Sequence, residues 1–280
     1  MRNYLVGVIC GTLLVMVASV GNAGMILHFP FDQVDGTGPF TTPDTSGLDN
    51  TGTLQVMTNS NLLPTGGVFG GALQFNGSNT AFDRVEIADG DLDFDRVYSE
   101  FTFAAWLKPS SAAFTEASSW IAGKMTTGNN RGWQMNLNPS NDLAHPSEIV
   151  FTYYLSNANV AANSQDVFLG PNASVAPDTW VHIAATFKAN DAVKLYVNGV
   201  LAVTAPALSA LNGSNSRPLQ IGNRGSSIAN SWNGLIDDVY MFDTALTPEQ
   251  ISAIVPELGS LSLAVFGLTM TMGLWKRRRF

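Results

Sequence analysis

The chain has 280 residues, a formal net charge of −8 and a single cysteine, Cys10. Between Gly24 and Val255 the sequence contains 9 Lys and Arg residues against 21 Asp and Glu residues. Such an acidic surface argues against nucleic acid or anionic lipid as a partner and leaves divalent cations as candidates. Because Cys10 stands near the N-terminus, the rest of the chain has no disulfide and no cysteine-based metal or redox site.

Residues 1–23 have the features of a secretory signal peptide. Arg2 provides a positive charge, Leu5–Val20 form an apolar stretch, and Gly21-Asn-Ala23 has the small-x-small pattern of a cleavage site. A membrane anchor is the alternative, but the apolar stretch is short and the cleavage pattern follows it directly. We therefore expect an exported protein whose domain occupies residues 24–255.

This region has the length of one domain and many short runs rich in β-branched and aromatic residues. The predicted strands are 25–31, 53–57, 72–75, 84–87, 101–107, 120–123, 132–137, 149–155, 166–169, 180–187, 193–197, 200–203, 221–223 and 235–242. Residues 193–197 alternate in the period of a strand with one buried face, and Asn198-Gly199 predicts a type I′ turn to the next strand. Thr247 is the predicted N-cap of a short helix, with Pro248 at its first position and Gln250 completing a capping box.

Four aspartates, Asp89, Asp91, Asp93 and Asp95, follow the strand at 84–87. Their spacing resembles the start of an EF-hand loop, but that loop needs glycine at its sixth position and a distant glutamate. The sixth residue here is Phe94 or Arg96. We therefore predict a solvated acidic turn at this place.

Several strings stand in the order found in one family of sandwiches. They are Leu27-His-Phe-Pro-Phe-Asp32, Asp44-Thr-Ser-Gly47, Gly70-Gly-Ala-Leu-Gln-Phe-Asn-Gly77, Phe101-Thr-Phe-Ala-Ala-Trp-Leu107, Trp120-Ile-Ala-Gly-Lys124, Trp180-Val-His-Ile-Ala-Ala-Thr-Phe187, Leu219-Gln-Ile-Gly222 and Gly234-Leu-Ile-Asp-Asp-Val-Tyr240. The set resembles laminin-G-like, concanavalin A-like domains. The resemblance implies an all-β, two-sheet antiparallel jelly-roll sandwich over roughly residues 25–254, with the first and last strands paired. An immunoglobulin-type sandwich and a closed barrel are alternatives that lack this motif order. The absence of cysteines favours a bacterial protein, because animal modules of this kind usually carry a disulfide.

Residues 256–280 have a different character from the domain. Pro256-Glu257 precede Leu258–Trp275, which carry no charge and are just long enough to cross a bilayer, and the basic run 276–279 follows. This order resembles the PEP-CTERM sorting signal of bacterial exosortase systems, although Leu258 stands where that signal has a second proline. The resemblance implies an exosortase-type processing peptidase as a partner and release at the cell surface. A permanent C-terminal anchor is the alternative.

The residue pattern argues against catalysis. Hydrolases of this sandwich type carry Glu-x-Asp-x-x-Glu, and none of the five glutamates of the domain stands in that spacing. No Gly-x-Ser-x-Gly elbow is present, and the histidines His28, His145 and His182 lack metal-ligand spacing. We expect no enzyme activity; for a hydrolase or lyase, Glu86 and Glu148 would be the carboxylates to consider.

The resemblance also implies a structural calcium ion held by Asp32, Asn76, Gly77 and Asp237, since Ca²⁺ prefers carboxylate and carbonyl oxygens. The alternative is that Asp237 and Asp238 merely cap a strand end.

For sugar binding, aromatic faces stack on pyranose rings while polar groups bind hydroxyls. Trp133, Tyr153 and Tyr154, with Asn130 and Arg131, flank the middle strands of the predicted concave sheet and form the predicted carbohydrate site. The alternative is that these aromatics belong to the core. The predicted function is an exported, non-catalytic surface or extracellular-matrix binding module for polysaccharide or another envelope component. A structural or adhesive protein without a small ligand and an uncharacterised polysaccharide hydrolase or lyase are the alternatives.

Overall fold

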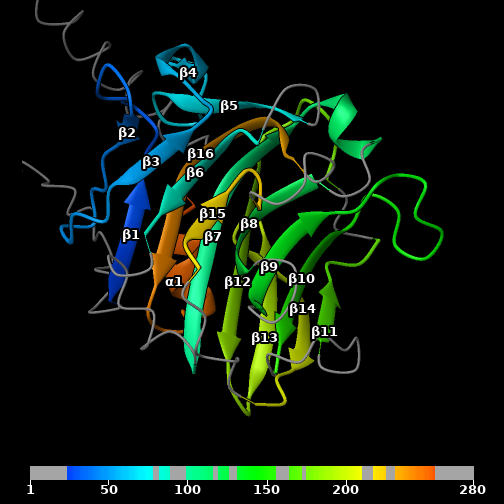
Figure 1. Cartoon of the computed structure of the whole chain (residues 1–280). Coiled ribbons are helices and arrows are strands. Elements are labelled where there is room, and N and C mark those ends of the chain that lie inside the picture. Colours follow the sequence, from blue (N-terminus) through cyan, green and yellow to red (C-terminus); the bar gives the residue numbers. More distant parts are fainter. Residues whose placement is uncertain are drawn as a thin grey trace, which may run out of the picture.

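The computed structural model describes residues 24–77, 82–88, 99–115, 119–125, 131–155, 164–171, 175–209, 217–224 and 231–255. Within these ranges the chain forms two antiparallel sheets packed face to face (Figure 1), the predicted jelly-roll sandwich. The predicted signal peptide, the aspartates of the acidic turn and the C-terminal tail lie outside the described residues.

One sheet, called sheet A, has the strand order β14-β13-β12-β7-β16-β5-β4, and β1 also pairs with β16. Its strands are β1 (Met25–Phe29), β4 (Leu62–Leu63), β5 (Ala72–Asn76), β7 (Glu100–Pro109), β12 (Val181–Lys188), β13 (Ala192–Val197), β14 (Val200–Pro206) and β16 (Asn233–Phe242). The predicted pairing of the first and last strands is confirmed. So is the turn between β13 and β14, where Asn198 and Gly199 have φ values of 48° and 79°.

The other sheet, called sheet B, has the order β11-β10-β9-β8-β15-β6-β3-β2. Its strands are β2 (Phe40–Thr42), β3 (Gly52–Gln55), β6 (Arg84–Ile87), β8 (Ser119–Met125), β9 (Arg131–Leu137), β10 (Ile149–Tyr154), β11 (Ser164–Phe168) and β15 (Leu219–Ile221). Two short 3₁₀ helices, η1 (Asn59–Asn61) and η4 (Ser111–Phe114), lie between strands. The sequence did not predict β2 and β4, because strands of three and two residues are too short to show a period.

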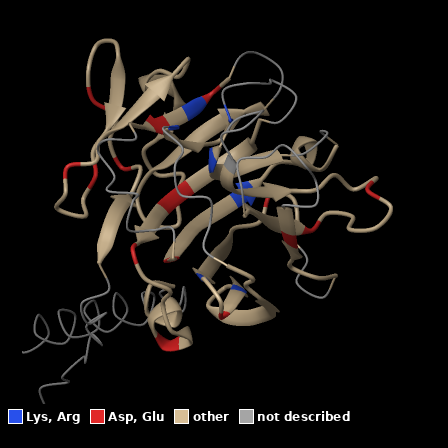
Figure 2. Ribbon diagram, turned by 60° about the horizontal axis from the view of Figure 1, so that its bottom comes forward, with Lys and Arg blue, Asp and Glu red and all other residues tan. Residues whose placement is uncertain are grey.

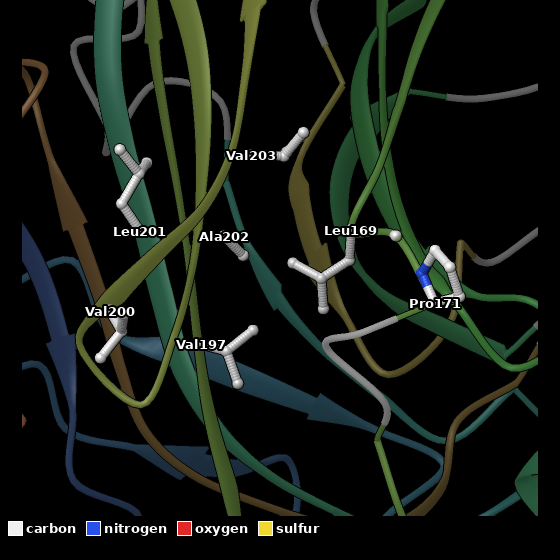
Figure 3. Close-up of a pocket in the computed structure, with 8 residues that line it drawn as sticks. Leu169, Pro171, Val197, Val200, Leu201, Ala202 and Val203 are labelled. Atoms are coloured by element: carbon white, nitrogen blue, oxygen red, sulfur yellow. The ribbon is translucent and has the colours of Figure 1, made fainter.

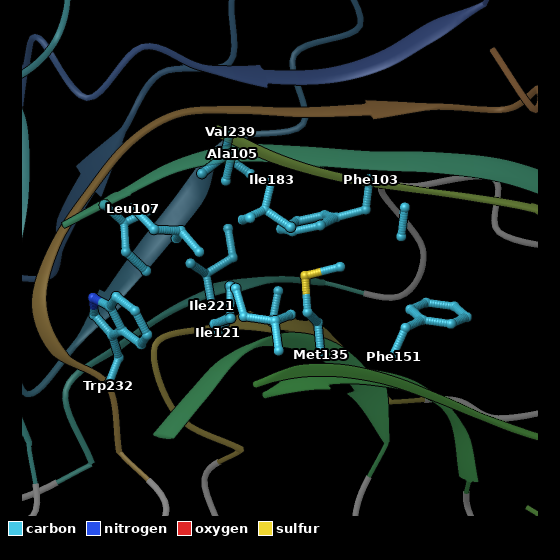
Figure 4. Close-up of a cluster of buried hydrophobic side chains, with 14 of the residues drawn as sticks. Phe103, Ala105, Leu107, Ile121, Met135, Phe151, Ile183, Ile221, Trp232 and Val239 are labelled. Carbon is cyan, nitrogen blue, oxygen red and sulfur yellow. The ribbon is translucent and has the colours of Figure 1, made fainter. Parts of the chain in front are cut away.

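The core lies between the two sheets (Figure 4). Phe103, Ala105 and Leu107 alternate along β7 of sheet A, and each is at most 1% exposed. Met135 and Phe151 of sheet B are fully buried as well. Each buried side chain of this size stabilises the fold by about 1.5–3 kcal/mol, so the hydrophobic contact between the sheets holds the sandwich together.

The helix α1 (Pro248–Ala253) packs on the outer face of sheet A. Its Ile251 is buried in a cluster with Tyr196 and Phe242. Thr247 and Gln250 form the predicted capping box. In the part of the chain that the structure describes, no helix is long and apolar enough to cross a membrane.

Candidate functional site

The outer face of sheet B carries a groove of about 250 Å³, called the sheet B groove. Its lining comes from alternate positions of three neighbouring strands and the residues that follow them: Gln134, Asn136 and Asn138; Val150, Thr152 and Tyr154; Ser164, Asp166 and Phe168. Because side chains alternate across a strand, the residues between these positions face the core. The sequence therefore gives this half of sheet B one apolar face and one face of amides and hydroxyls.

Strand pairing arranges the groove residues in rows. Thr152 lies opposite Gln134 on β9 and opposite Asp166 on β11. Asn136, Val150 and Phe168 form the next row. With strands about 4.8 Å apart and rows about 6.6 Å apart, the floor is about 10 Å wide and about 20 Å long. A short oligosaccharide fits on such a surface.

Hydrogen-bonding groups dominate the groove. The Thr152 hydroxyl donates to Asp166 Oδ1 at 2.7 Å, which orients the exposed Asp166 carboxylate. Asn136 is only 7% exposed, and its Oδ1 atom has no hydrogen-bond partner. An unsatisfied buried acceptor costs about 1–3 kcal/mol, and a ligand hydroxyl that donates to it would remove that cost.

The two aromatic residues of the groove are largely covered. Tyr154 is 6% exposed and packs in a cluster with Trp120 and Met125. One face of Phe168 is stacked on the His145 ring, with centroids 3.5 Å apart. The groove therefore offers hydrogen bonds in place of a broad stacking surface.

The structure corrects two of the five residues of the predicted carbohydrate site. Trp133 and Tyr153 occupy the inward positions of β9 and β10, where they are 2% and 0% exposed. Trp133 packs against Phe101 at 5.2 Å, and Tyr153 packs edge-on against Phe187 at 5.1 Å. The prediction that their faces stack on a sugar is wrong, because the opposite sheet covers them.

Of the other three residues, Tyr154 does line the groove, Asn130 lies outside the described residues, and Arg131 begins β9 with a side chain outside the described part. The sequence does carry a signal for the groove, namely the alternation of polar and apolar residues along β9. Gln134, Asn136 and Asn138 are polar at every second position of a strand whose other positions are apolar.

The two glutamates considered for catalysis are engaged and far apart. Glu86 Oε1 accepts from Arg84 Nε at 2.7 Å and from Gln220 Nε2 at 2.8 Å. Glu148 Oε2 accepts from the Gly170 amide at 3.2 Å. Three strands separate β6 from β10, which places them about 19 Å apart, whereas glycosidase carboxylates stand about 5–9.5 Å apart. Glu86 and Glu148 therefore do not form a hydrolytic pair.

Two of the predicted calcium ligands meet at one loop, residues 67–71. Asp237 Oδ2 accepts from the Val68 amide at 2.7 Å, and Asp32 Oδ1 accepts from the Gly71 amide at 2.6 Å. Gly67 and Gly70 have no room for a side chain, because a Cβ atom would collide with these carboxylates.

Asp237 is fully buried beside Asp238. Burial, followed by the neighbouring Asp238 charge, raises the pKa of Asp237 to about 7, although three backbone amides act in the opposite direction.

Asn76 and Gly77 do not join this pair, so the predicted four-residue site does not assemble. Asn76 lies opposite Asn233, four residues before Asp237, which corresponds to about 13 Å along β16. Asn76 Nδ2 instead donates to Asp83 Oδ2 at 2.9 Å. Among the described residues, no group of three or more His, Cys, Asp or Glu side chains is placed to hold a metal.

The histidines have structural surroundings. His28 Nε2 lies 2.9 Å from Asp238 Oδ1, and its ring stacks on Tyr240, so it connects β1 to β16. His182 is fully buried on the outer side of β12, and its ring centroid lies 5.4 Å from that of Trp106. Burial lowers the pKa of His182 to about 3, so the ring stays neutral at physiological pH.

A second, apolar pocket of about 420 Å³ lies between the β13–β14 hairpin and the turn after β11 (Figure 3). Its side chains come from Leu169, Pro171, Val197 and residues 200–203, with Val200 69% exposed. None of these side chains bears a hydrogen-bonding group.

The acidic residues of the molecule are distributed over strands, loops and α1 (Figure 2).

The fold and the groove together define a jelly-roll sandwich with a hydrogen-bonding surface on one outer face. The chain belongs to the concanavalin A-like lectin/glucanases superfamily, whose family model matches residues 76–252. A 75-residue stretch is 32% identical to the adhesion G-protein coupled receptor D1 of Homo sapiens, over 26% of this chain and 9% of the receptor.

Solved structures with the same fold include binding domains of bacterial toxins. The binding domain of botulinum neurotoxin DC in complex with SialylT has a TM-score of 0.59 and 17% identity, over 86% of this chain and 52% of that chain. Domain 4 of AbnA, a GH43 extracellular arabinanase from Geobacillus stearothermophilus, in complex with arabinotriose, has a TM-score of 0.59 and 18% identity, over 84% of this chain and 99% of that domain. The chain thus spans about half of the neurotoxin domain. At these identities the likeness concerns the fold.

Proposed function

We propose that this protein is an exported, non-catalytic module that binds polysaccharide in the sheet B groove. The observation that carries the proposal is Asn136, which lines this polar groove and whose buried Oδ1 atom has no hydrogen-bond partner. Sugars are dense in hydroxyl donors, which is the chemistry that this acceptor and its amide and hydroxyl neighbours match.

The comparisons support this proposal. One structural neighbour is a neurotoxin binding domain in complex with SialylT, and another is an arabinanase domain in complex with arabinotriose. The first is the binding domain of a neurotoxin, and the second is one domain of an arabinanase. The wide separation of Glu86 and Glu148 supports a role without hydrolysis.

A structural calcium ion beside Asp32 and Asp237 forms the second part of the proposal. The two carboxylates and the carbonyl groups of loop 67–71 are the oxygen ligands that Ca²⁺ takes. A divalent cation would neutralise the buried Asp237 charge, which burial and Asp238 disfavour. The ion would stabilise the contact between this loop and strand β16.

The location of the protein is also part of the proposal. The leader at 1–23 directs export, and the tail at 256–280 anchors the protein in the membrane, transiently if an exosortase-type peptidase cleaves it. Mass spectrometry of the C-terminus of the protein from its native host tests this: loss of the basic run 276–279 supports cleavage, and an intact tail indicates a permanent anchor.

A glycan and polysaccharide array probed with the full-length chain in mild detergent tests the binding function. We expect binding to at least one polysaccharide and its loss in the Asn136→Val variant. Binding to no glycan would favour a structural or adhesive role. Release of reducing ends from a bound polysaccharide would favour a hydrolase and contradict the proposal.

A further inference from the structure

The charge of the sheet B groove identifies the class of polysaccharide that it accepts. We infer that the groove takes uncharged polysaccharides and rejects anionic ones, with Asp166 as the residue that determines this selectivity. The inference rests on the proposed binding function and concerns the same site.

Asp166 is the single charged residue of the groove lining that the structure describes. It is exposed, and the hydroxyl of buried Thr152 fixes it from the floor at 2.7 Å. Any sugar that lies across Gln134 and Thr152 passes over this carboxylate, because the three residues form one row across the strands.

The described basic residues of sheet B are engaged elsewhere. Arg84 lies on β6, four strands away from β10, and its Nε atom donates to Glu86. Lys124 of β8 is 1% exposed, and its Nζ atom donates to the Arg217 carbonyl at 2.7 Å. Neither lines the groove. Among the described lining residues, a uronate or sulfate group there would meet the Asp166 carboxylate and no lysine or arginine side chain.

The rest of the groove favours a ligand that donates hydrogen bonds. Asn136 Oδ1 is an acceptor without a partner, and the Asp166 carboxylate can only accept. Asn138 Nδ2 is within 3.4 Å of the His145 carbonyl, so one of its donors is already directed away from a ligand. Neutral sugars supply hydroxyl donors to these acceptors, whereas carboxylate and sulfate groups add further acceptors.

The test compares neutral and anionic polysaccharides on the full-length chain. Laminarin, arabinan and galactomannan are the neutral probes, and polygalacturonate, alginate and carrageenan are the anionic ones. The variants are Asp166→Asn and a charge-matched control, Asp191→Asn, whose exposed carboxylate lies in the turn between β12 and β13. Circular dichroism melts establish that both variants fold.

We expect the wild type to bind a neutral probe and to bind anionic probes more weakly. Asp166→Asn should raise the affinity for anionic probes about fourfold at low salt, the factor for two unit charges about 5 Å apart in water, while Asp191→Asn leaves it unchanged. The wild type should also gain affinity for anionic probes as salt screens the repulsion.

Tighter binding of an anionic probe than of every neutral one would overturn the selectivity and leave the binding function intact. An equal gain in Asp191→Asn would also overturn it, because the effect would then come from net charge. Binding of no probe at all would refute the binding function itself.

Discussion

Replacing Asn136 by valine should change stability and binding in opposite directions: the folded state should become more stable, and the affinity for polysaccharide should fall. The wild-type side chain is 7% exposed and has an acceptor oxygen without a partner, which costs the folded state about 1–3 kcal/mol. Valine removes that cost and suits a strand. The free energy of unfolding should therefore rise by about 1–3 kcal/mol.

At about 2–4 °C per kcal/mol for a domain of this size, the melting temperature should rise by about 2–12 °C. Affinity for the bound polysaccharide should fall about tenfold or more, because one hydrogen bond to the ligand is lost and an apolar group faces its hydroxyls.

The assay pairs thermal melts with binding isotherms on the full-length chain. The matched control is Asn223→Val. Asn223 is fully buried, and its Nδ2 atom donates to Ser231 Oγ at 2.6 Å. That variant should lose about 2 kcal/mol, or about 4–8 °C, without an effect on sugar affinity. If Asn136→Val melts as far below the wild type as Asn223→Val does, Asn136 is a structural residue and its oxygen is not a free acceptor for a ligand.

Three further outcomes are expected. When free Ca²⁺ is a hundredfold above its dissociation constant, the melting temperature should be about 5–11 °C higher than in EDTA. Asp237→Ala should abolish this shift, and Asn76→Ala should keep it. Identical melting curves in millimolar Ca²⁺ and in EDTA would exclude the ion. The pKa of His182 is about 3 in the folded protein and about 6.5 in the unfolded chain, so the unfolded chain gains a proton first as pH falls. Between pH 7 and pH 5, the free energy of unfolding should therefore fall by about 2 kcal/mol more in the wild type than in His182→Leu. Parallel profiles of stability against pH would contradict this. Trp133→Leu should cost about 3 kcal/mol and leave the sugar affinity unchanged, whereas lost affinity at unchanged stability would return Trp133 to the binding site.

The sequence was most informative where local physics and tertiary structure agree. The Asn198-Gly199 turn, the capping box at Thr247 and the inward positions of Val193 and Leu195 on β13 were predictable. Positive φ, backbone capping and period-2 alternation are local requirements. Strands β2 and β4 were not predictable, since they exist through pairing with β3 and β5.

The candidate site was harder to predict, because a strand pattern does not reveal which face turns outward. Trp133 and Gln134 are neighbours on β9, and only the position of the opposite sheet decides that the tryptophan fills the core and the glutamine lines the groove. Likewise, only the tertiary structure brings Asp32 and Asp237 to the same loop, where both accept hydrogen bonds from backbone amides. Asn76 lies at the far end of β5, opposite Asn233.

A crystal structure of the protein with a fragment of the polysaccharide that it binds most tightly tests the proposed binding site most directly. We expect sugar density across β9, β10 and β11, with a hydroxyl within about 3.2 Å of Asn136 Oδ1 and another near Asp166. A sugar bound at the loops that join the sheets or in the apolar pocket beside Val200, with no sugar over these strands, would contradict it.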